Sequence, residues 1–386
     1  MRIPRILAVV LAGGKGSRLG ALTANRVKPA LPIAGTYRLI DVALSNLAHS
    51  HISDVWLVQQ YLPHTLNRYL ANGRPWDLDR SHGGLQVLPP FEGAQGEGFA
   101  HGNSDSLYRQ KELIRRFEPD LVLVLSADHL YTVNFLDVLD THQSRSADLT
   151  MVTTEVSENP SRFAVVEVDD SGLVTGFEYK PDKPKSHLVA GEMFLYDADL
   201  LLKALETLHE QHGELQDYGD DLVPWFVEHH TVVSHPLEGY WMDLGTLQSY
   251  WTAHMQLLDD SGAVLDDPGW PILSAQPQLL PSRVSINADI RGSMISAGSH
   301  VRGKVKNSVL GPRVVIERGA TVHNSVLLDG VHVRAGAVLD NVIADIDARI
   351  SSGTYGRAGA VTLIDSDGEI DSTQEFDRAA ALPSGF

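Results

Sequence analysis

The chain has 386 residues, no cysteine and a formal net charge of −18 at pH 7. The missing cysteines exclude disulfides, thiolate metal sites and cysteine nucleophiles. The acidic balance argues against a nucleic-acid or anionic-membrane surface, because such surfaces need basic charge. The first apolar run, Ile6 to Ala12, is too short to span a membrane, and we expect a cytoplasmic protein without membrane contact.

The first half of the sequence alternates apolar strand patterns with helical patterns. Strands are expected at 6–12, 54–58, 121–125, 149–153, 163–168 and 173–179, and helices at 39–50, 65–72 and 105–117. Strand, helix and strand in series predict an α/β fold, a parallel sheet covered by helices.

The pattern changes after about residue 280. Small aliphatic residues recur every five or six positions, and glycine or asparagine occupies many of the turns between them. This period is typical of the hexapeptide repeats of a parallel β-helix, and an irregular β-sandwich is the alternative. The domains are therefore expected at 1–257 (catalytic), 258–281 (linker), 282–352 (β-helix) and 353–386 (weakly ordered tail).

A glycine-rich turn follows the first strand. Leu19 breaks the dinucleotide-binding pattern, and Gly16 after Lys15 breaks the P-loop pattern. What remains is a turn whose backbone N–H groups can approach phosphate oxygens. The cations Lys15, Arg18 and Lys28 would neutralise the charge of a polyphosphate. The alternative is an ordinary turn with solvated basic residues.

Two carboxylates and one lysine complete the candidate chemistry. Asp128 comes directly after a buried strand, at the sheet edge where open α/β folds bind ligands. A carboxylate there would repel a polyphosphate unless it held a divalent cation, and Asp243 is a candidate second ligand. Lys180 precedes Pro181, so we expect extended backbone that presents its ammonium group to a second phosphate. The alternative roles are a helix cap for Asp128, a turn carboxylate for Asp243 and a solvated side chain for Lys180.

Together these motifs resemble the glucose-1-phosphate adenylyltransferases of bacterial glycogen synthesis. The resemblance covers about residues 5–350 and rests on segments 11–19, 26–30, 37–46, 60–66, 127–131 and 240–246. It implies a Rossmann-like, mainly parallel nucleotidyltransferase domain followed by a left-handed parallel β-helix. It also implies that ATP and glucose 1-phosphate give ADP-glucose and pyrophosphate, with Mg²⁺ as the cofactor and a homotetramer as the assembly.

The resemblance assigns roles residue by residue. Catalysis falls to Arg18, Lys28 and Asp128, with Asp128 and Asp243 as the metal ligands. The nucleotide would be bound by Leu11, Ala12, Gly13, Gly14, Lys15, Gly16, Gln60, Gly102 and Asp105. The sugar phosphate would be bound by Tyr179, Lys180, Gly191 and Asp243.

Several positions depart from the family pattern. Phe91 and Glu92 stand where a glutamine near adenine is usual, and Tyr179 stands where a glutamate is usual. Val189 and Ala190 replace the Ser-Met that lines the sugar, and Asn25 replaces a regulatory lysine. Another sugar 1-phosphate or nucleotide, or a non-catalytic regulatory paralogue, therefore stays open. A β-helix acyltransferase is a further alternative, with His300, His323 and His332 as candidate bases.

Overall fold

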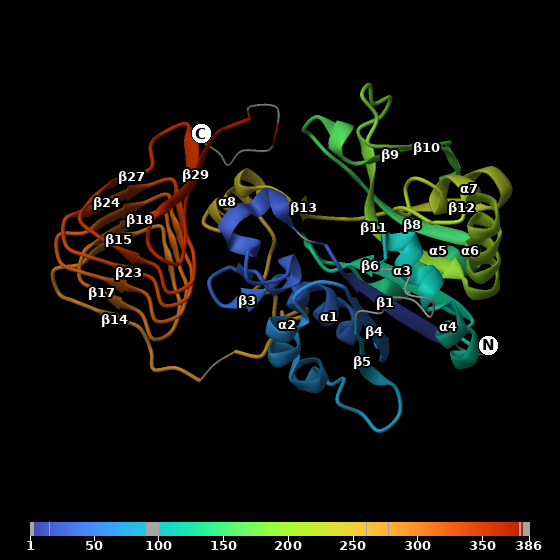
Figure 1. Cartoon of the computed structure of the whole chain (residues 1–386), viewed down its shortest axis with the longest axis horizontal. Helices are drawn as coiled ribbons and strands as arrows, with labels where there is room; N and C mark the ends of the chain where they lie inside the picture. The colour runs from blue at the N-terminus through green and yellow to red at the C-terminus, as the bar shows by residue number, and fades with distance from the viewer. Residues whose placement is uncertain are drawn as a thin grey trace. The chain divides into compact units, whose positions relative to one another are not determined.

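The computed structural model describes residues 4–14, 16–89, 100–259, 261–276, 278–377 and 380 (Figure 1). The chain divides into two compact units. Unit 1 is built from Met1–Gly14, Ala43–Ala127 and Thr132–Trp241, and unit 2 from Lys15–Val42, Asp128–Tyr131 and Met242–Phe386. This division differs from the expected boundary at 257, because Lys15–Val42, Asp128–Tyr131 and residues 242–257 belong with the C-terminal half.

Unit 1 contains a nine-stranded sheet in which β8 pairs with β11 and β12, and the other strands follow the order β10-β9-β11-β6-β1-β4-β5. The strands are β1 (Ile6–Ala12), β4 (Asp54–Gln59), β5 (Gly84–Leu88), β6 (Leu121–Ser126), β8 (Leu149–Glu155), β9 (Ala164–Val168), β10 (Val174–Tyr179), β11 (Leu188–Asp197) and β12 (Val232–Pro236). β1 pairs in parallel with β4 and β6, and β4 with β5. β11 runs antiparallel to β6 and β8. The predicted parallel core is confirmed, within a mixed sheet.

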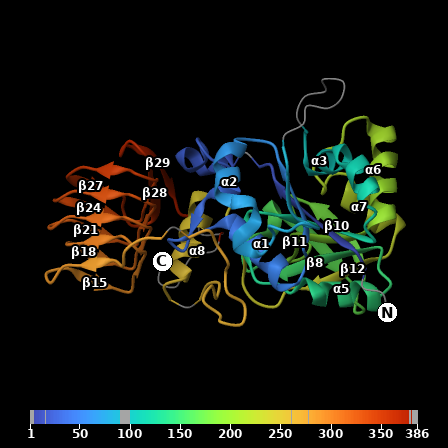
Figure 2. The same ribbon diagram turned by 90° about the horizontal axis from the view of Figure 1, so that it is seen from below.

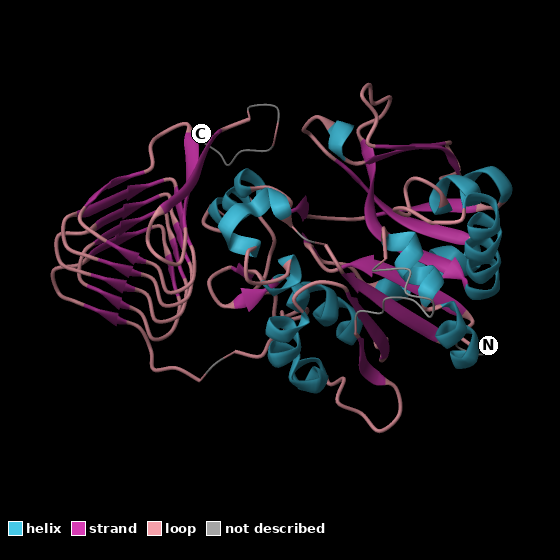
Figure 3. Cartoon of the chain, in the orientation of Figure 1, coloured by secondary structure: helices cyan, strands magenta, loops and turns pink. Residues whose placement is uncertain are grey.

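The helices of the first 230 residues are α1 (Leu39–His49), α2 (Pro63–Leu70), α3 (Asn103–Arg109), α4 (Lys111–Phe117), α5 (Phe135–Ser144), α6 (Ala198–His212) and α7 (Leu222–His229), with 3-10 turns η3 (Ala71–Trp76) and η4 (Pro160–Arg162). Helices lie at the three predicted positions, and α5, α6 and α7 add helices that were not predicted (Figure 3). The helix expected at 105–117 is interrupted at Gln110, between α3 and α4. Among the described residues, no helix combines the length and the apolar character that a membrane span needs.

The C-terminal part of unit 2 is a β-helix made of three stacked sheets of short strands (Figure 2). Its strands are β14 (Arg283–Val284), β15 (Asp289–Arg291), β16 (Met294–Ile295), β17 (His300–Val301), β18 (Lys304–Lys306), β19 (Val309–Leu310), β20 (Val315–Ile316), β21 (Thr321–His323), β22 (Val326–Leu327), β23 (His332–Val333), β24 (Ala337–Asp340), β25 (Val342–Ala344) and β26 (Arg349–Ile350). From β14 to β25, each strand pairs in parallel with the strand three places later, such as β17 with β20. Parallel sheets of this kind are those of the predicted left-handed β-helix.

The sequence pattern explains the coils of the β-helix. The aliphatic side chains point inward, and Val301, Leu310 and Val322 are completely buried. Asn307 and Asn324 turn one corner of successive coils with φ of 45° and 46°. Asparagine tolerates this left-handed conformation better than most residues. The predicted aliphatic residues therefore form the interior of the β-helix, and the predicted asparagines form its turns.

The expected weakly ordered tail at 353–386 is wrong for its first 23 residues. β27 (Gly353–Tyr355) and β28 (Ala360–Ile364) complete a further coil, and β29 (Ile370–Glu375) pairs with β28 in an antiparallel hairpin. Leu363 and Ile364 are completely buried, so they continue the aliphatic interior. The glycine-rich composition that suggested disorder belongs to turns. Residues 378, 379 and 381–386 lie outside the described part.

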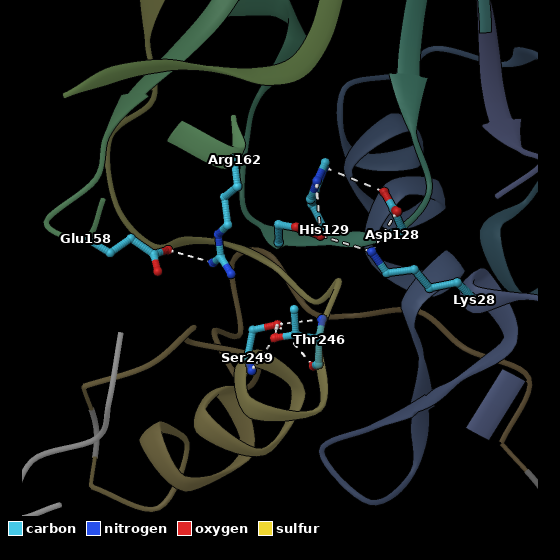
Figure 4. Close-up of polar contacts among 8 residues, drawn as sticks. Lys28, Asp128, His129, Glu158, Arg162, Thr246 and Ser249 are labelled. Carbon is cyan, nitrogen blue, oxygen red and sulfur yellow. Dashed lines mark hydrogen bonds and ion pairs between the residues drawn. The ribbon is translucent and has the colours of Figure 1, made fainter. Parts of the chain in front are cut away.

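The remaining elements of unit 2 precede the β-helix in the chain. They are η1 (Ser17–Thr23), η2 (Lys28–Ala30), β2 (Pro32–Ile33), β3 (Tyr37–Arg38), β7 (His129–Tyr131), the end of β13 (Trp241–Asp243) and α8 (Leu247–Gln256). Helix α8 begins with a capping box between Thr246 and Ser249 (Figure 4). The Trp251 Nε1 atom donates to the Asn324 carbonyl at 2.7 Å. α8 thereby joins the β-helix to the rest of unit 2.

Candidate active site

Unit 2 contains a cluster of three predicted site residues, in which a buried lysine lies between two partly exposed carboxylates. The Lys28 Nζ atom lies 2.8 Å from Asp128 Oδ2 and 2.9 Å from Asp243 Oδ1, and Lys28 is 5% exposed (Figure 4). Burial disfavours the charged form of Lys28. The charges and hydrogen bonds of Asp128 and Asp243 outweigh that effect and raise the pKa of Lys28. The lysine is therefore the counter-ion of both carboxylates.

The local fold explains why the two carboxylates meet. Asp128 lies between β6 and β7, and Asp243 is the last residue of β13. Because β7 pairs with β13, the two short strands bring these side chains together. Burial alone would raise the pKa of Asp243, but the charges of Lys28 and His129 hold that pKa below its usual value. The carboxylate of Asp243 is thus ionised.

His129 belongs to the same cluster, although no role was predicted for it. It is buried, with Nδ1 at 3.7 Å from Asp128 Oδ1 and Nε2 at 3.7 Å from Asp243 Oδ1. The available signal was its place directly after Asp128, at the start of a short apolar segment. Two carboxylates, an ammonium group and an imidazole therefore converge within unit 2.

The described part of the glycine-rich turn in unit 2 adds Gly16 and Arg18. Gly16 has φ of 65°, and a Cβ atom there would lie 2.9 Å from Thr23 Cγ2, so only glycine fits. A Cβ atom on Gly245 would lie 3.0 Å from Arg18 Nη2 and 2.8 Å from Asp243 Oδ2. The Arg18 guanidinium is therefore close to the carboxylate cluster. Lys15 lies outside the described residues.

Unit 1 holds a second group of predicted residues, at the carboxyl ends of its central strands. Leu11 and Ala12 end β1, where Ala12 pairs with Gln59 of β4. A Cβ atom on Gly13 would lie 3.1 Å from Gln60 Oε1, while Gly14 has open space around it. Parallel strands that end together form the usual ligand-binding edge of an α/β sheet.

Helix α3 begins at the same group. The Gln60 amide donates to Ser106 Oγ at 2.7 Å, which ties α3 to the end of β4. A Cβ atom on Gly102 would lie 2.2 Å from the Gln216 carbonyl carbon, so the chain requires glycine there. Asp105 is 5% exposed and accepts a hydrogen bond from Arg109 Nε at 3.1 Å. In this structure Asp105 fixes the first turn of α3.

The predicted sugar-phosphate residues form a third, local group in unit 1. The Lys180 ammonium donates to the Tyr179 hydroxyl at 2.6 Å, and that hydroxyl donates to Asp217 Oδ2 at 3.2 Å. Burial, followed by the charge of Asp217, raises the pKa of Tyr179. Lys180 has φ of 49°, so the expectation of extended backbone before Pro181 is wrong. The turn is stabilised by the Lys180 N–H bond to the Phe163 carbonyl at 3.0 Å.

A β-bulge in β11 places Gly191 and Glu192. The pairing of β11 with β8 shifts between Ala190 and Phe194, and Glu192 has φ of 58°. A side chain other than glycine with positive φ is strained, and such strain is common at functional sites. Burial and the charge of Glu192 raise the pKa of Tyr218, and the same charge adds to the raised pKa of Tyr179. Glu192 and Asp217 were missed, although Glu192 adjoins the departures at Val189 and Ala190.

The histidines considered for an acyltransferase pair with residues of the β-helix itself. His323 Nδ1 lies 3.0 Å from Asp340 Oδ1, and His332 Nε2 lies 2.8 Å from Glu317 Oε1. His300 contacts the Arg302 guanidinium at 3.1 Å. These pairs lie on the outside of the coils, and within one described chain they form no shared catalytic group.

Comparison with known proteins agrees with this architecture. The Nucleotidyl transferase family matches residues 7–260, and the GlmU-like, C-terminal hexapeptide family matches residues 279–360. A glucose-1-phosphate adenylyltransferase of Clostridium acetobutylicum is 39% identical over 320 residues, which cover 82% of this chain and 84% of the relative. Relatives of the same name from Bacillus cytotoxicus and Bacillus thuringiensis (strain Al Hakam) are 37% and 36% identical, over 87% and 91% of this chain and 90% and 94% of their own lengths.

The chain belongs to the glucose-1-phosphate adenylyltransferase family. The resemblance seen in the sequence is thereby confirmed at the level of the family and its two-part fold. The roles of single residues stay predictions. Among the departures from the family pattern, Phe91 and Glu92 lie outside the described residues. The departure at Tyr179 is described, and its hydroxyl links Lys180 to Asp217.

Proposed function

We propose that the chain converts ATP and α-D-glucose 1-phosphate into ADP-glucose and pyrophosphate, in the cytoplasm, and so feeds glycogen or α-glucan synthesis. The observation that carries the proposal is the cluster in which the buried Lys28 bridges Asp128 and Asp243. A buried charge such as that of Lys28 is costly unless it is paired, and phosphoryl chemistry uses such charges. The names of the relatives supply the substrates.

In the proposed reaction, a phosphate oxygen of the sugar phosphate attacks the α-phosphorus of ATP in line. The bond between the α-phosphorus and the bridging oxygen breaks, and pyrophosphate leaves with the electron pair. The reaction needs no covalent enzyme intermediate, so the protein contributes positioning and charge stabilisation. Arg18 and Lys28 would stabilise negative charge on the transferred and leaving phosphates.

The donor set suits Mg²⁺. Asp128 and Asp243 are carboxylates, the hard oxygen donors that this ion prefers. The structure already places one cation, the Lys28 ammonium, against an oxygen of each. The two carboxylates would hold Mg²⁺, which when bound would neutralise charge on the phosphates. Lys28 would then turn from the carboxylates towards phosphate oxygens.

The residues of unit 1 would bind the substrates. The turn Gly13–Gly14, with Gln60, Gly102 and Asp105, would hold the nucleotide; Gly13 stands against Gln60 at the carboxyl edge of the sheet. Lys180 would bind the phosphate of the sugar, assisted by Tyr179 and Gly191. Asp217 keeps the Tyr179 hydroxyl in place, so the lysine is held at one end of a hydrogen-bonded chain.

A second candidate is the same chemistry with another sugar 1-phosphate. It is favoured by the replacement of a glutamate at Tyr179 and by Glu192 in the bulge of β11. A site with different hydrogen-bonding groups reads different sugar hydroxyls or amino groups. A non-catalytic regulatory paralogue is disfavoured, because such a protein has no need for both Asp128 and Asp243.

Three further assignments are part of the proposal. We place the catalytic domain at 1–257, the linker at 258–281 and the β-helix from 282 onward. α8 ends at Gln256 and β14 begins at Arg283, and the described residues between them contain neither helix nor strand. We also propose a homotetramer, by resemblance to the family. Mass measurement in solution would test that assembly.

The experiment is a pyrophosphate-release matrix. It crosses ATP, UTP, dTTP, GTP and CTP with the 1-phosphates of glucose, glucosamine, mannose and galactose, each with Mg²⁺ and with EDTA. Mg²⁺-dependent release confined to ATP and glucose 1-phosphate supports the proposal. A preference for another pair keeps the mechanism and changes the substrate. No release from folded protein supports the regulatory alternative.

A further inference from the structure

One ion pair joins the β-helix to the segment that carries Lys28. Arg26 Nη1 donates to Asp345 Oδ1 at 2.5 Å, and Arg26 Nη2 donates to Asp345 Oδ2 at 3.3 Å. The side chains are 13% and 5% exposed. A two-point arginine–carboxylate contact fixes orientation as well as distance. This pair therefore restrains both the position and the direction of Arg26.

Asp345 belongs to a rigid part of the β-helix. It follows β25 directly, its N–H donates to the Ile364 carbonyl at 2.9 Å, and its own carbonyl accepts the Ala348 N–H at 3.2 Å. Ile364 and Ala348 are completely buried in the interior of the coils. The carboxylate is thus held by the backbone of two coils.

Arg26 stands two residues before Lys28. Between them Val27 is 2% exposed, and its carbonyl accepts the Ala30 N–H at 3.0 Å. This bond closes the turn η2, in which Lys28 is the first residue. With Val27 buried and η2 closed, the position of the Arg26 backbone sets the position from which the Lys28 side chain starts.

The β-helix also approaches residues on either side of the Arg26–Lys28 segment, at other coils. A Cβ atom on Gly35 would lie 3.2 Å from the Leu310 carbonyl, and one on Gly20 would lie 3.2 Å from Leu363 Cδ2. These contacts are steric, whereas the Arg26–Asp345 contact is ionic and directional. The ion pair is therefore the point at which the segment is fixed most specifically.

We propose that Asp345 is a positioning residue for the reaction, which holds Lys28 in register through Arg26. The inference rests on the proposed function for its kinetic consequence only. Removing one partner of a buried ion pair leaves the other charge without compensation, so the segment must shift to solvate it. Displacement of a catalytic group by about 1 Å can lower turnover by about 10²-fold.

The test is a double-mutant cycle with Asp345→Asn, Arg26→Gln and the double variant, and Arg26→Lys as the conservative change. The control is Asp340→Asn, which removes a carboxylate of the β-helix that pairs with His323 instead. We expect kcat of each single variant to fall by about tenfold or more. The KM values should stay near wild type, since neither side chain is assigned to a substrate.

The double variant separates positioning from general damage. If the pair acts as a unit, its kcat should be no lower than that of either single variant, and Arg26→Lys should retain part of the activity. Wild-type kcat in Asp345→Asn would overturn the inference. So would a loss of kcat that adds in the double variant, or one matched by Asp340→Asn.

A second readout does not depend on activity. Amide hydrogen exchange across residues 24–31 should be faster in Asp345→Asn and unchanged in Asp340→Asn, because the ion pair orders that segment. If wild type and the control release no pyrophosphate but exchange changes as expected, the proposed function fails, and the structural part of the inference stands: Asp345 orders the segment that carries Lys28. Unchanged exchange in Asp345→Asn would refute the inference itself.

Discussion

The Lys28 ammonium and the Asp243 carboxylate lie 2.9 Å apart, with side chains that are 7% and 14% exposed. Lys28 also contacts Asp128, so it balances two negative charges, one from the loop between β6 and β7 and one from the end of β13. The arrangement is an ion-pair network whose cation is supplied by the protein.

Replacing Lys28 with methionine tests the carboxylate pair without relying on turnover. The change leaves Asp128 and Asp243 without their counter-ion, so it should destabilise the protein by roughly 3–5 kcal/mol. Mg²⁺ should then raise the thermal midpoint of the variant more than that of wild type, because the ion replaces the lost charge. The measurement is thermal unfolding with Mg²⁺ and with EDTA.

The control for that prediction is the double change Lys28→Met with Asp243→Asn. It removes one carboxylate and should reduce the Mg²⁺ effect. An equal Mg²⁺ effect in wild type and in both variants would place the metal elsewhere. Pyrophosphate release should be lost in both variants.

Lys180→Gln should raise the KM for the sugar phosphate by about tenfold or more, since a charge-assisted phosphate contact is lost. The KM for the nucleotide should stay unchanged. Lys185→Gln is the matched control, because Lys185 pairs with Glu178 on the surface. Steady-state kinetics with each substrate varied in turn give the answer. Equal effects on both KM values would remove Lys180 from the sugar site.

His254 predicts a loss of stability in mild acid. This histidine is completely buried in α8, where Nδ1–H donates to the Tyr250 carbonyl at 2.7 Å. Burial lowers the pKa of His254 from 6.5 to about 4. Between these values the unfolded chain binds a proton that the folded chain does not. Above about pH 6.5 the neutral His254 does not lower the free energy of unfolding. As the pH falls from there to about 4, protonation of His254 in the unfolded chain lowers that free energy by up to roughly 3 kcal/mol.

The measurement for His254 is the thermal midpoint as a function of pH. His254→Leu should flatten the decline between about pH 6.5 and 4 relative to wild type. His64→Leu changes an exposed histidine and should leave the decline as it is. If the His254→Leu curve parallels that of wild type, His254 does not have the lowered pKa.

The C-terminal hairpin should stabilise unit 2. Phe376 packs on Trp251 with ring centroids 5.0 Å apart, and the Asp377 N–H donates to Gln248 Oε1 at 2.7 Å. Phe376→Ala should lower stability by roughly 1–3 kcal/mol. Ile370→Ala alters an exposed residue of β29, the strand that precedes Phe376, and should have little effect. Thermal unfolding of both variants compares them, and equal midpoints would mean that the contact with α8 contributes nothing.

Much of the fold could be read from the sequence because its patterns are local. The apolar run at 6–12 forms one buried strand, and the aliphatic residues that recur after residue 280 form the buried interior of the β-helix. In both cases the burial pattern is visible in a short stretch of sequence. The strands within residues 353–375 could not be predicted from the sequence, since the turns between them have the composition of a disordered segment. Only the stacking of β28 on β25 shows where Leu363 and Ile364 are buried.

The candidate site was partly readable for the same reason. Asp128 and Lys28 belong to compact motifs, so their chemistry is visible in a short stretch of sequence. The partners Asp217 and Asp345 are separated by long stretches from the residues they hold, and only the fold brings them close. The backbone of Lys180 was misjudged because a hydrogen bond to Phe163 overrides the usual preference before proline.

The stacking of the β-helix also limits how this chain can change in length. Each coil adds one strand spacing, about 4.8 Å, and repeat proteins commonly gain or lose whole repeats. Here Trp251 of α8 donates a hydrogen bond to Asn324, and Arg26 of the Lys28 segment pairs with Asp345 on the next coil. A coil inserted between them would leave the β-helix intact but carry Asp345 beyond the reach of Arg26. Insertions and deletions of whole coils should therefore be tolerated only where they do not separate these two contacts.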